Sequence, residues 1–214
     1  MKQQSIILLH NSEMHPSGVV GGKGANLLLL TKLQYAVPPG FILSTLFFEE
    51  VMKHTAVSSM MKNMSKENNV AKILSYAEQI KHIILSTSFS EQLQREIYKT
   101  FDSLHFDSVS VRSSTTVEDG LCYSFAGFFE TYLHVKRKDI IKSIINCWIS
   151  TYSERVLKYM VRSGIPMEKL KPAVVIQKMI VPDKAGVMFT RNVNTGNNNE
   201  LIIESCDGLG SQVV

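Results

Sequence analysis

One short segment constrains the fold more than any other. Residues 173–179 read AVVIQKM and are almost continuously apolar, with Gln177 as the first polar side chain in the run. A strand with one face in water alternates apolar and polar residues, whereas an unbroken apolar run is typical of a strand buried on both faces. We therefore expect this segment to form an inner strand of a covered sheet.

Helices supply the cover. Apolar residues at helical spacing predict an amphipathic helix over 70–86 and a second one that buries Leu93, Ile97 and Phe101. Ser88 and Glu91 are predicted to form the capping box of that second helix. A third helical face runs from Asp139 through Trp148 towards Tyr159. The polar, Met-rich residues 60–69 are expected to form a mobile loop.

Several shorter apolar segments have the length and composition of strands. We predict these strands at 6–9, 41–43, 109–111, 131–135, 186–190 and 201–204, the last two as a hairpin. Strands and helices of this kind, mixed along the chain, predict an α+β fold.

The segment 109–132 has the layout of an anion site. A short β-branched strand delivers Arg112 to a Ser/Thr-rich run, and a small-residue turn at 124–127 follows. A fixed guanidinium offers a planar fork of donors to phosphate. Glycine allows close backbone approach, and successive N–H groups in a turn can hold an anion. A Ser/Thr-rich surface loop with a solvated arginine is the other interpretation, and the residues alone leave both open.

A second glycine-rich segment lies near the amino end. Residues 18–24 read GVVGGKG and precede a predicted helix over 25–33. Free N–H groups and the positive end of the helix dipole make such a terminus suited to anions, and Lys23 adds a full charge. The segment is not a P-loop, because Gly24 follows the lysine where that motif needs Ser or Thr. A glycine turn with an exposed lysine remains the alternative.

Composition limits the partners. The chain has 23 Lys and Arg against 19 Asp and Glu, and its densest basic cluster, 136–138, is too short for a nucleic-acid arm. Its longest uncharged stretch, 33–48, contains two prolines and a glycine, which argues against a membrane span. Three cysteines without a CxxC pair predict reduced thiols. We expect a cytoplasmic protein without nucleic-acid or membrane partners.

Several motifs fall in one order along the chain. They are VGGKGANL at 20–27, VPPGF at 37–41, VRSSTTVED at 111–119, SFAG at 124–127 with ETYL at 130–133, CW at 147–148 with ER at 154–155, GVMFT at 186–190, and IE at 203–204 with GLG at 208–210. Together they resemble the N-terminal ATP-binding domain of the phosphoenolpyruvate synthase, pyruvate phosphate dikinase and rifampicin phosphotransferase family. The resemblance covers nearly the whole chain and is weakest across 48–105.

The resemblance implies a fold and an activity. The fold would be ATP-grasp-like, with residues 1–180 as the N-terminal lobe and 181–214 as the start of a truncated second lobe. In that family, ATP gives its β-phosphate to a histidine on a separate mobile domain, releasing AMP and phosphate. The phosphohistidine then serves an acceptor such as pyruvate or a rifamycin. This chain alone would be inactive; the alternative is a non-catalytic truncated module that contacts a partner.

The resemblance also implies site residues. Lys23 and Arg112 correspond to the phosphate clamps, and Gly127 and Thr131 to the phosphate-loop contacts. The adenine-side edge corresponds to Gln177 and Met179, and a ribose- or hinge-side contact to Glu204. No catalytic residue or metal ligand is expected within the chain, because the family's Mg²⁺ ligands lie downstream of its GLG turn and thus beyond Val214.

Overall fold

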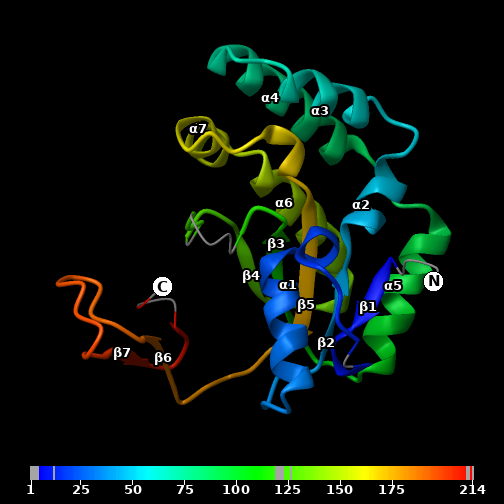
Figure 1. Cartoon of the computed structure of the whole chain (residues 1–214). Helices are drawn as coiled ribbons and strands as arrows, with labels where there is room; N and C mark the ends of the chain where they lie inside the picture. Colours follow the sequence, from blue (N-terminus) through cyan, green and yellow to red (C-terminus); the bar gives the residue numbers. More distant parts are fainter. Residues whose placement is uncertain (1–4, 12, 119–122, 126, 211–212, 214) are drawn as a thin grey trace. The chain divides into compact units, whose positions relative to one another are not determined.

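The computed structural model describes residues 5–11, 13–118, 123–125, 127–210 and 213 (Figure 1). Asp119, Cys122 and Ala126 of the segment singled out above lie outside these residues. The chain folds as two compact units, one up to Met179 and the other from Ile180 onward. Each unit is described by itself.

The first unit is built on a five-stranded antiparallel sheet. Its strand order is β1 (Ile6–Leu8), β2 (Gly40–Leu43), β5 (Pro172–Lys178), β3 (Val109–Thr115) and β4 (Thr131–Val135). Strand β5 is central, and every residue from Pro172 to Gln177 is buried. The prediction of an inner, doubly covered strand is therefore confirmed.

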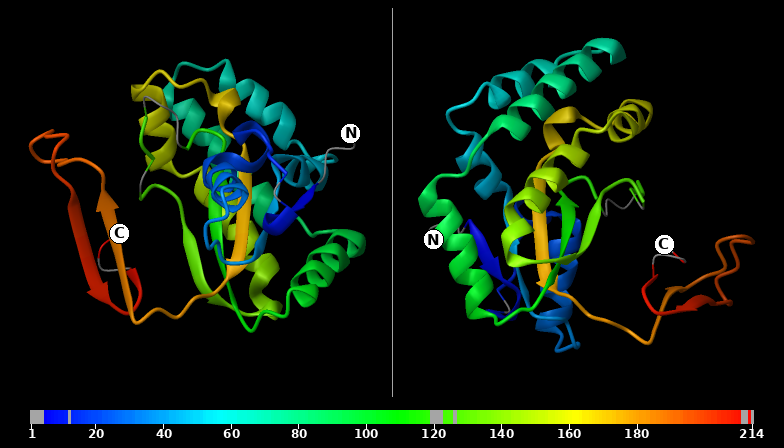
Figure 2. Two further views of the ribbon diagram at one scale, coloured as in Figure 1. Left: turned by 60° about the horizontal axis from the view of Figure 1, so that its bottom comes forward. Right: turned by 180° about the vertical axis from the view of Figure 1, so that it is seen from behind.

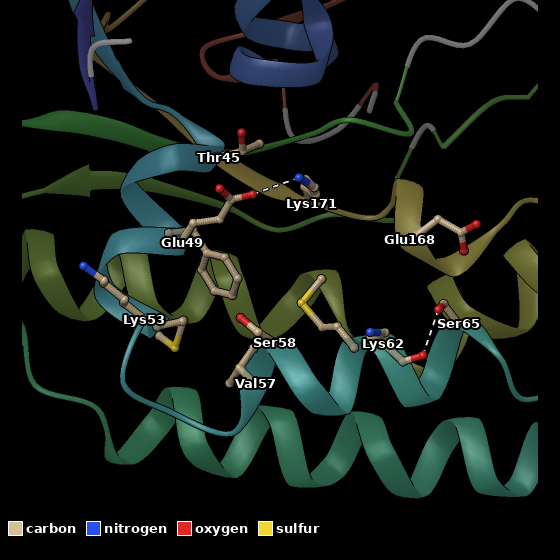
Figure 3. Close-up of a pocket in the computed structure, with 12 residues that line it drawn as sticks. Thr45, Glu49, Lys53, Val57, Ser58, Lys62, Ser65, Glu168 and Lys171 are labelled. Atoms are coloured by element: carbon tan, nitrogen blue, oxygen red, sulfur yellow. Dashed lines mark hydrogen bonds and ion pairs between the residues drawn. The ribbon is translucent and has the colours of Figure 1, made fainter. Parts of the chain in front are cut away.

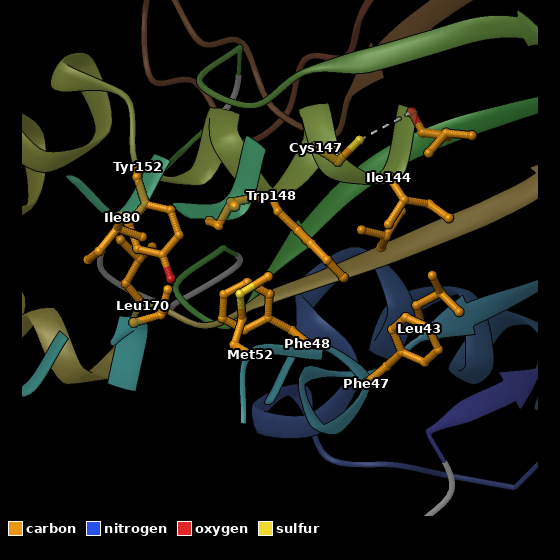
Figure 4. Packing of buried hydrophobic residues seen from close by; sticks show 14 of the residues in the cluster. Leu43, Phe47, Phe48, Met52, Ile80, Ile144, Cys147, Trp148, Tyr152 and Leu170 are labelled. Carbon is orange, nitrogen blue, oxygen red and sulfur yellow. Dashed lines mark hydrogen bonds between the residues drawn. The ribbon is translucent and has the colours of Figure 1, made fainter. Parts of the chain in front are cut away.

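The sheet separates two hydrophobic cores. Helix α1 (Ser17–Lys32) packs on one face, where Leu28 meets Ile42 and Val175. The opposite face carries the larger core, in which α6 (Ile140–Thr151) places Trp148 beside Phe48 with ring centroids 5.0 Å apart (Figure 4). Neighbouring residues of a strand point to opposite faces, so β2 and β5 serve both cores at once.

The remaining helices complete the larger core. They are α2 (Thr45–Met52), α3 (Val57–Ser65), α4 (Val70–Ser86), α5 (Glu91–Ser103) and α7 (Glu154–Arg162), with short 3₁₀ turns η1 (Leu9–Asn11), η2 (Arg137–Asp139) and η3 (Met167–Lys169). Helices α3, α4 and α7 gather beyond one end of the sheet (Figure 2). The stripe predicted for 70–86 is buried as expected.

The loop predicted for 60–69 is wrong. Residues 57–65 form α3, in which Met64 is fully buried and Met60 and Met61 pack against the core. Val57, Met60, Met61 and Met64 recur at helical spacing and form the face of α3 that packs on the core. The intervening Ser58, Ser59, Lys62 and Asn63 hid this period in the sequence.

Two predicted helix boundaries also change. The cap of α5 is Ser90, whose hydroxyl accepts the N–H of Leu93 at 3.3 Å, so Glu91 is the first helical residue and not the third position of a capping box with Ser88. The single helix predicted from Asp139 towards Tyr159 is two helices. Helix α6 ends at Thr151, and α7 begins at Glu154 after Ser153 in an extended conformation.

The second unit contains the predicted hairpin. Strands β6 (Lys184–Phe189) and β7 (Ile202–Asp207) pair antiparallel, with Val187 opposite Glu204. Mixed helices and antiparallel strands across both units confirm the α+β class. Within the described part of the chain, no helix combines the length and apolar character that crossing a membrane requires.

Candidate functional site

The glycine-rich segment forms a break inside α1 and not a turn ahead of it. Gly21 has φ 71° and ψ 173°, while the residues on either side of it are helical. The sequence predicts a turn over 18–24 followed by a helix from residue 25. In the structure only Gly21 is non-helical, and the helix continues from Gly22. Lys23 lies in the first turn of this resumed helix, where the positive end of the dipole is located.

Ser114 of β3 fixes this break. A Cβ placed on Gly21 would stand 2.0 Å from the Ser114 carbonyl oxygen, so only glycine fits. The Ser114 hydroxyl donates to the Val20 carbonyl at 2.8 Å and accepts the Gly24 N–H at 3.0 Å. One buried side chain therefore bridges both sides of the break and ties α1 to the sheet. The Gly24 N–H is satisfied within the protein.

Lys23 lies beside the carboxylate of Glu118, and Arg112 is near enough to respond to the charge of that carboxylate. Lys23 forms an ion pair with Glu118, whose side chain is only 9% exposed against 24% for the lysine. Burial lowers the pKa of Arg112 from its ordinary value, and the negative charge of Glu118 opposes that shift. The Phe129 ring lies 5.8 Å from the Lys23 ammonium. The structure thus brings two predicted site residues together around a third that sequence reasoning had given no role.

Thr131 lies opposite Arg112 in the sheet, and Gly127 lies in the turn that precedes β4. Thr131 of β4 is the register partner of Arg112, and register partners share one face of a sheet. Gly127 has φ +70° and is exposed, with no heavy atom within 4 Å of the position a Cβ would take. Its conformation favours glycine, and its surroundings leave open space for another molecule.

Arg155 of α7 holds the Gly127 turn. Its Nη1 donates to the Gly127 carbonyl at 3.1 Å, and its guanidinium lies 4.3 Å from the centroid of the Phe128 ring. Phe125, at 2% exposure, anchors the same segment through an edge contact with Tyr159, 4.9 Å between centroids. The sequence left the role of Arg155 undecided, because its partner, the Gly127 carbonyl, lies on another element.

Gln177 and Met179 lie at the end of β5. The Gln177 side chain is 4% exposed, and its amide donates to the Pro38 carbonyl at 3.1 Å. The Met179 N–H donates to the Ser108 carbonyl at 3.0 Å. Both groups therefore make contacts within the protein that position the 38–40 segment and the start of β3.

Glu204 is an exposed residue of β7 in the second unit. Metal-ligand clusters of three or more His, Cys, Asp or Glu side chains do not occur among the described residues.

A cavity of about 450 Å³ lies away from these residues, between α2, α3 and η3 (Figure 3). Phe48, Met52 and Met61 line it, and the ion pair of Lys171 with Glu49, 2.8 Å, lies at its edge. None of the predicted site residues lines it.

Comparison with known proteins decides the family. Residues 17–214 match the family model described as pyruvate phosphate dikinase, AMP/ATP-binding domain. The chain belongs to this family. The resemblance inferred from the ordered motifs is confirmed, and the unit carrying Lys23 and Arg112 is part of an AMP/ATP-binding domain.

Individual relatives of this AMP/ATP-binding domain are much longer proteins. A probable phosphoenolpyruvate synthase of Methanothermobacter thermautotrophicus is 34% identical over 207 residues, covering 92% of this chain and 30% of the relative. The phosphoenolpyruvate synthase of Aeropyrum pernix is 32% identical over 225 residues, covering 100% and 27%. The rifampicin phosphotransferase of Bacillus cereus is 32% identical over 204 residues, covering 92% and 23%. The chain spans less than a third of each.

Proposed function

We propose that this domain binds ATP for a phosphotransferase that passes the β-phosphate to a histidine on a separate domain, releasing AMP and phosphate. The phosphohistidine would then serve an acceptor of the kind named by the relatives, pyruvate or a rifamycin. The observation that carries the proposal is the ion pair of Lys23, from the broken helix, with Glu118, whose charge also acts on Arg112 of the sheet. Two cations held this way form a site for a polyanion.

Lys23 and Arg112 would bind the phosphate oxygens. Phosphoryl transfer depends mainly on positioning and on neutralising charge that spreads over phosphate oxygens, so fixed cations contribute more than a general base. Arg112 is largely buried, which limits the rotamers it must give up on binding. Lys23 is fixed through the Gly21–Ser114 contact.

The remaining predicted residues would surround the nucleotide. Gly127 offers its backbone at an open turn, and Thr131 places a hydroxyl across from Arg112. Gln177 and Met179 would form the adenine-side edge, and Glu204 the ribose or hinge side, in an ATP-grasp-like arrangement of two lobes. Mg²⁺ would neutralise part of the triphosphate charge, and the described residues contain no cluster of three or more His, Cys, Asp or Glu side chains to hold it.

The histidine that receives phosphate and the acceptor site would lie on other domains. We therefore expect these 214 residues to bind ATP without completing turnover. The buried Cys147 and partly buried Cys206 are free thiols, in keeping with the cytoplasmic location that we propose.

Label transfer tests the proposal. A chimera in which this chain replaces the matched segment of the M. thermautotrophicus relative should transfer label from β-³²P-ATP to protein histidine and release AMP. The same chimera with Lys23→Ala should lose both products. Labelling from γ-³²P-ATP instead, or unchanged transfer in the Lys23→Ala chimera, would contradict the assigned chemistry.

A further inference from the structure

We propose that Glu118 is a built-in competitor of the phosphate: its carboxylate holds the cations that ATP needs, and ATP binds by displacing it. The proposal rests on the ATP site argued above and concerns how that site is controlled. Its basis is the ion pair of Lys23 with the largely buried Glu118; the charge of this carboxylate also acts on Arg112.

The pair is shielded from water. Glu118 is 9% exposed and Lys23 is 24% exposed, so solvent screens their attraction less than it would at the surface. An exposed pair such as Arg95 with Glu91 on α5, where the side chains are 73% and 88% exposed, exchanges with water at little energetic cost. Glu118 is thus a specific partner of Lys23 and not one of many solvated charges.

A carboxylate and a phosphate make the same demand on these cations. Both are anions that accept hydrogen bonds from an ammonium or a guanidinium. Two anions at the same pair of cations repel each other, and the repulsion grows in a partly buried site. A bound phosphate therefore requires that Glu118 move away or lose its charge.

The position of Glu118 suits such a movement. It lies just beyond the end of β3 at Thr115, in a turn closed by its own N–H to the Thr115 carbonyl at 3.3 Å. Arg112 and Ser114, in contrast, lie within the β3 ladder to β5. A turn at a strand end can rearrange without breaking the sheet, so the carboxylate can leave while the cations stay in place.

Displacement has a consequence for ligand choice. A ligand with a single negative charge replaces one carboxylate by an equivalent group and gains little. A triphosphate brings several charges to the same cations and gains more than Glu118 gives up. Glu118 would therefore weaken the binding of every anion, and the loss of affinity would be greatest for ligands with little charge. The site would then favour polyphosphates.

The alternative is that Glu118 supports phosphate binding. If Glu118 served only to hold Lys23 in position, its removal would loosen the lysine and weaken phosphate binding. The two roles predict changes of opposite sign, so one substitution separates them.

The experiment titrates the whole chain with ATP and, separately, with inorganic tripolyphosphate in a calorimeter at fixed ionic strength. Glu118→Gln should bind both probes about tenfold more tightly than wild type. Glu91→Gln, which breaks an exposed pair with Arg95 on α5, should bind as wild type does. Adding Lys23→Ala to Glu118→Gln should abolish the gain, because the released cation is then absent. Thermal melts establish that each variant is folded.

Equal or weaker binding by folded Glu118→Gln overturns the proposal, as does the absence of any tripolyphosphate binding to it. If Glu118→Gln fails to fold, Glu118→Asp replaces it: the shorter side chain keeps the charge but loosens the pair, and should bind about threefold more tightly. Unchanged or weaker binding by Glu118→Asp then overturns it. Tighter tripolyphosphate binding without ATP binding would support the competitor and refute the ATP site. If Glu118→Gln binds ATP with the same affinity as wild type, the ATP site is supported and the competitor role of Glu118 is refuted.

Discussion

Gly21 of α1 lies so close to Ser114 of β3 that a methyl group on the glycine would stand 2.0 Å from the serine's carbonyl oxygen. This contact joins two segments far apart in the chain, and each carries one of the two cations. It sets the position of the helical turn with Lys23 relative to the strand with Arg112. The site is therefore a product of packing between α1 and the sheet.

Gly21→Ala should destabilise the fold strongly. The alanine would be strained at φ 71° and would overlap backbone atoms that cannot move without disturbing β3. Strain and overpacking together should lower the free energy of unfolding by about 3 kcal/mol or more. Gly18→Ala, in the same helix with no heavy atom within 4 Å of the new Cβ, should change it by less than about 1 kcal/mol in either direction. Urea titrations of both variants provide the measurement, and similar stabilities would refute the packing argument.

Ser114→Ala should loosen the break in α1. It removes the hydrogen bonds to the Val20 carbonyl and the Gly24 N–H and leaves both groups buried, which should lower the free energy of unfolding by about 1–3 kcal/mol. ATP affinity should fall as well, because Lys23 is no longer fixed. Ser110→Ala, on the same strand but partly exposed, is the control. Denaturant titration measures the free energy of unfolding of the two variants, and calorimetry measures their ATP affinity. Equal effects at both positions would argue against a bridging role of Ser114.

Arg155→Met should weaken ATP binding about tenfold with little loss of stability. The side chain is exposed, yet it holds the Gly127 carbonyl at 3.1 Å and stacks on Phe128. Arg155→Lys should restore only part of the affinity, because an ammonium lacks the planar fork. Arg162→Met, an exposed arginine on the same helix, should bind as wild type does. Wild-type affinity in Arg155→Met would show that the turn does not depend on α7.

Cys147 should resist alkylation while the protein is folded. It is 1% exposed, and burial raises the pKa of its thiol to about 12. The raised pKa also means that unfolding becomes easier as pH rises from about 9 towards 12, since the unfolded chain loses this proton first. Mass spectrometry after iodoacetamide treatment at pH 8 should find Cys206 labelled ahead of Cys147, and equal labelling in denaturant. Equal rates in the folded protein would contradict the buried position of the thiol.

Sequence patterns predicted those elements whose signal is local. Strand β5 and the stripe of α4 have unbroken or periodic apolar residues, so both could be placed from the sequence. Helix α3 could not be placed, because polar residues such as Ser58, Ser59, Lys62 and Asn63 interrupt its short apolar stripe. The cap of α5 was placed two residues early, since Ser88 and Ser90 offer the same chemistry and only the helix start distinguishes them.

In the candidate site, too, local motifs could be recognised from the sequence and non-local contacts could not. Lys23 and Arg112 could be named from motifs, but the carboxylate between them could not, because Glu118 reaches Lys23 only once α1 packs on β3. Arg155 could not be assigned for a similar reason: its partner, the Gly127 carbonyl, lies on a different element. Non-local contacts of this kind leave no periodic trace in the sequence.

The central claim is that Lys23 and Arg112 bind the phosphates of one ATP molecule. Calorimetric titration of the chain with ATP tests it most directly, using Lys23→Ala and Arg112→Ala with Lys72→Ala as an exposed control on α4. Each site substitution should weaken binding by about 2–5 kcal/mol, and the control should not change it. ATP affinity that stays at the wild-type level in folded Lys23→Ala and Arg112→Ala would contradict the claim.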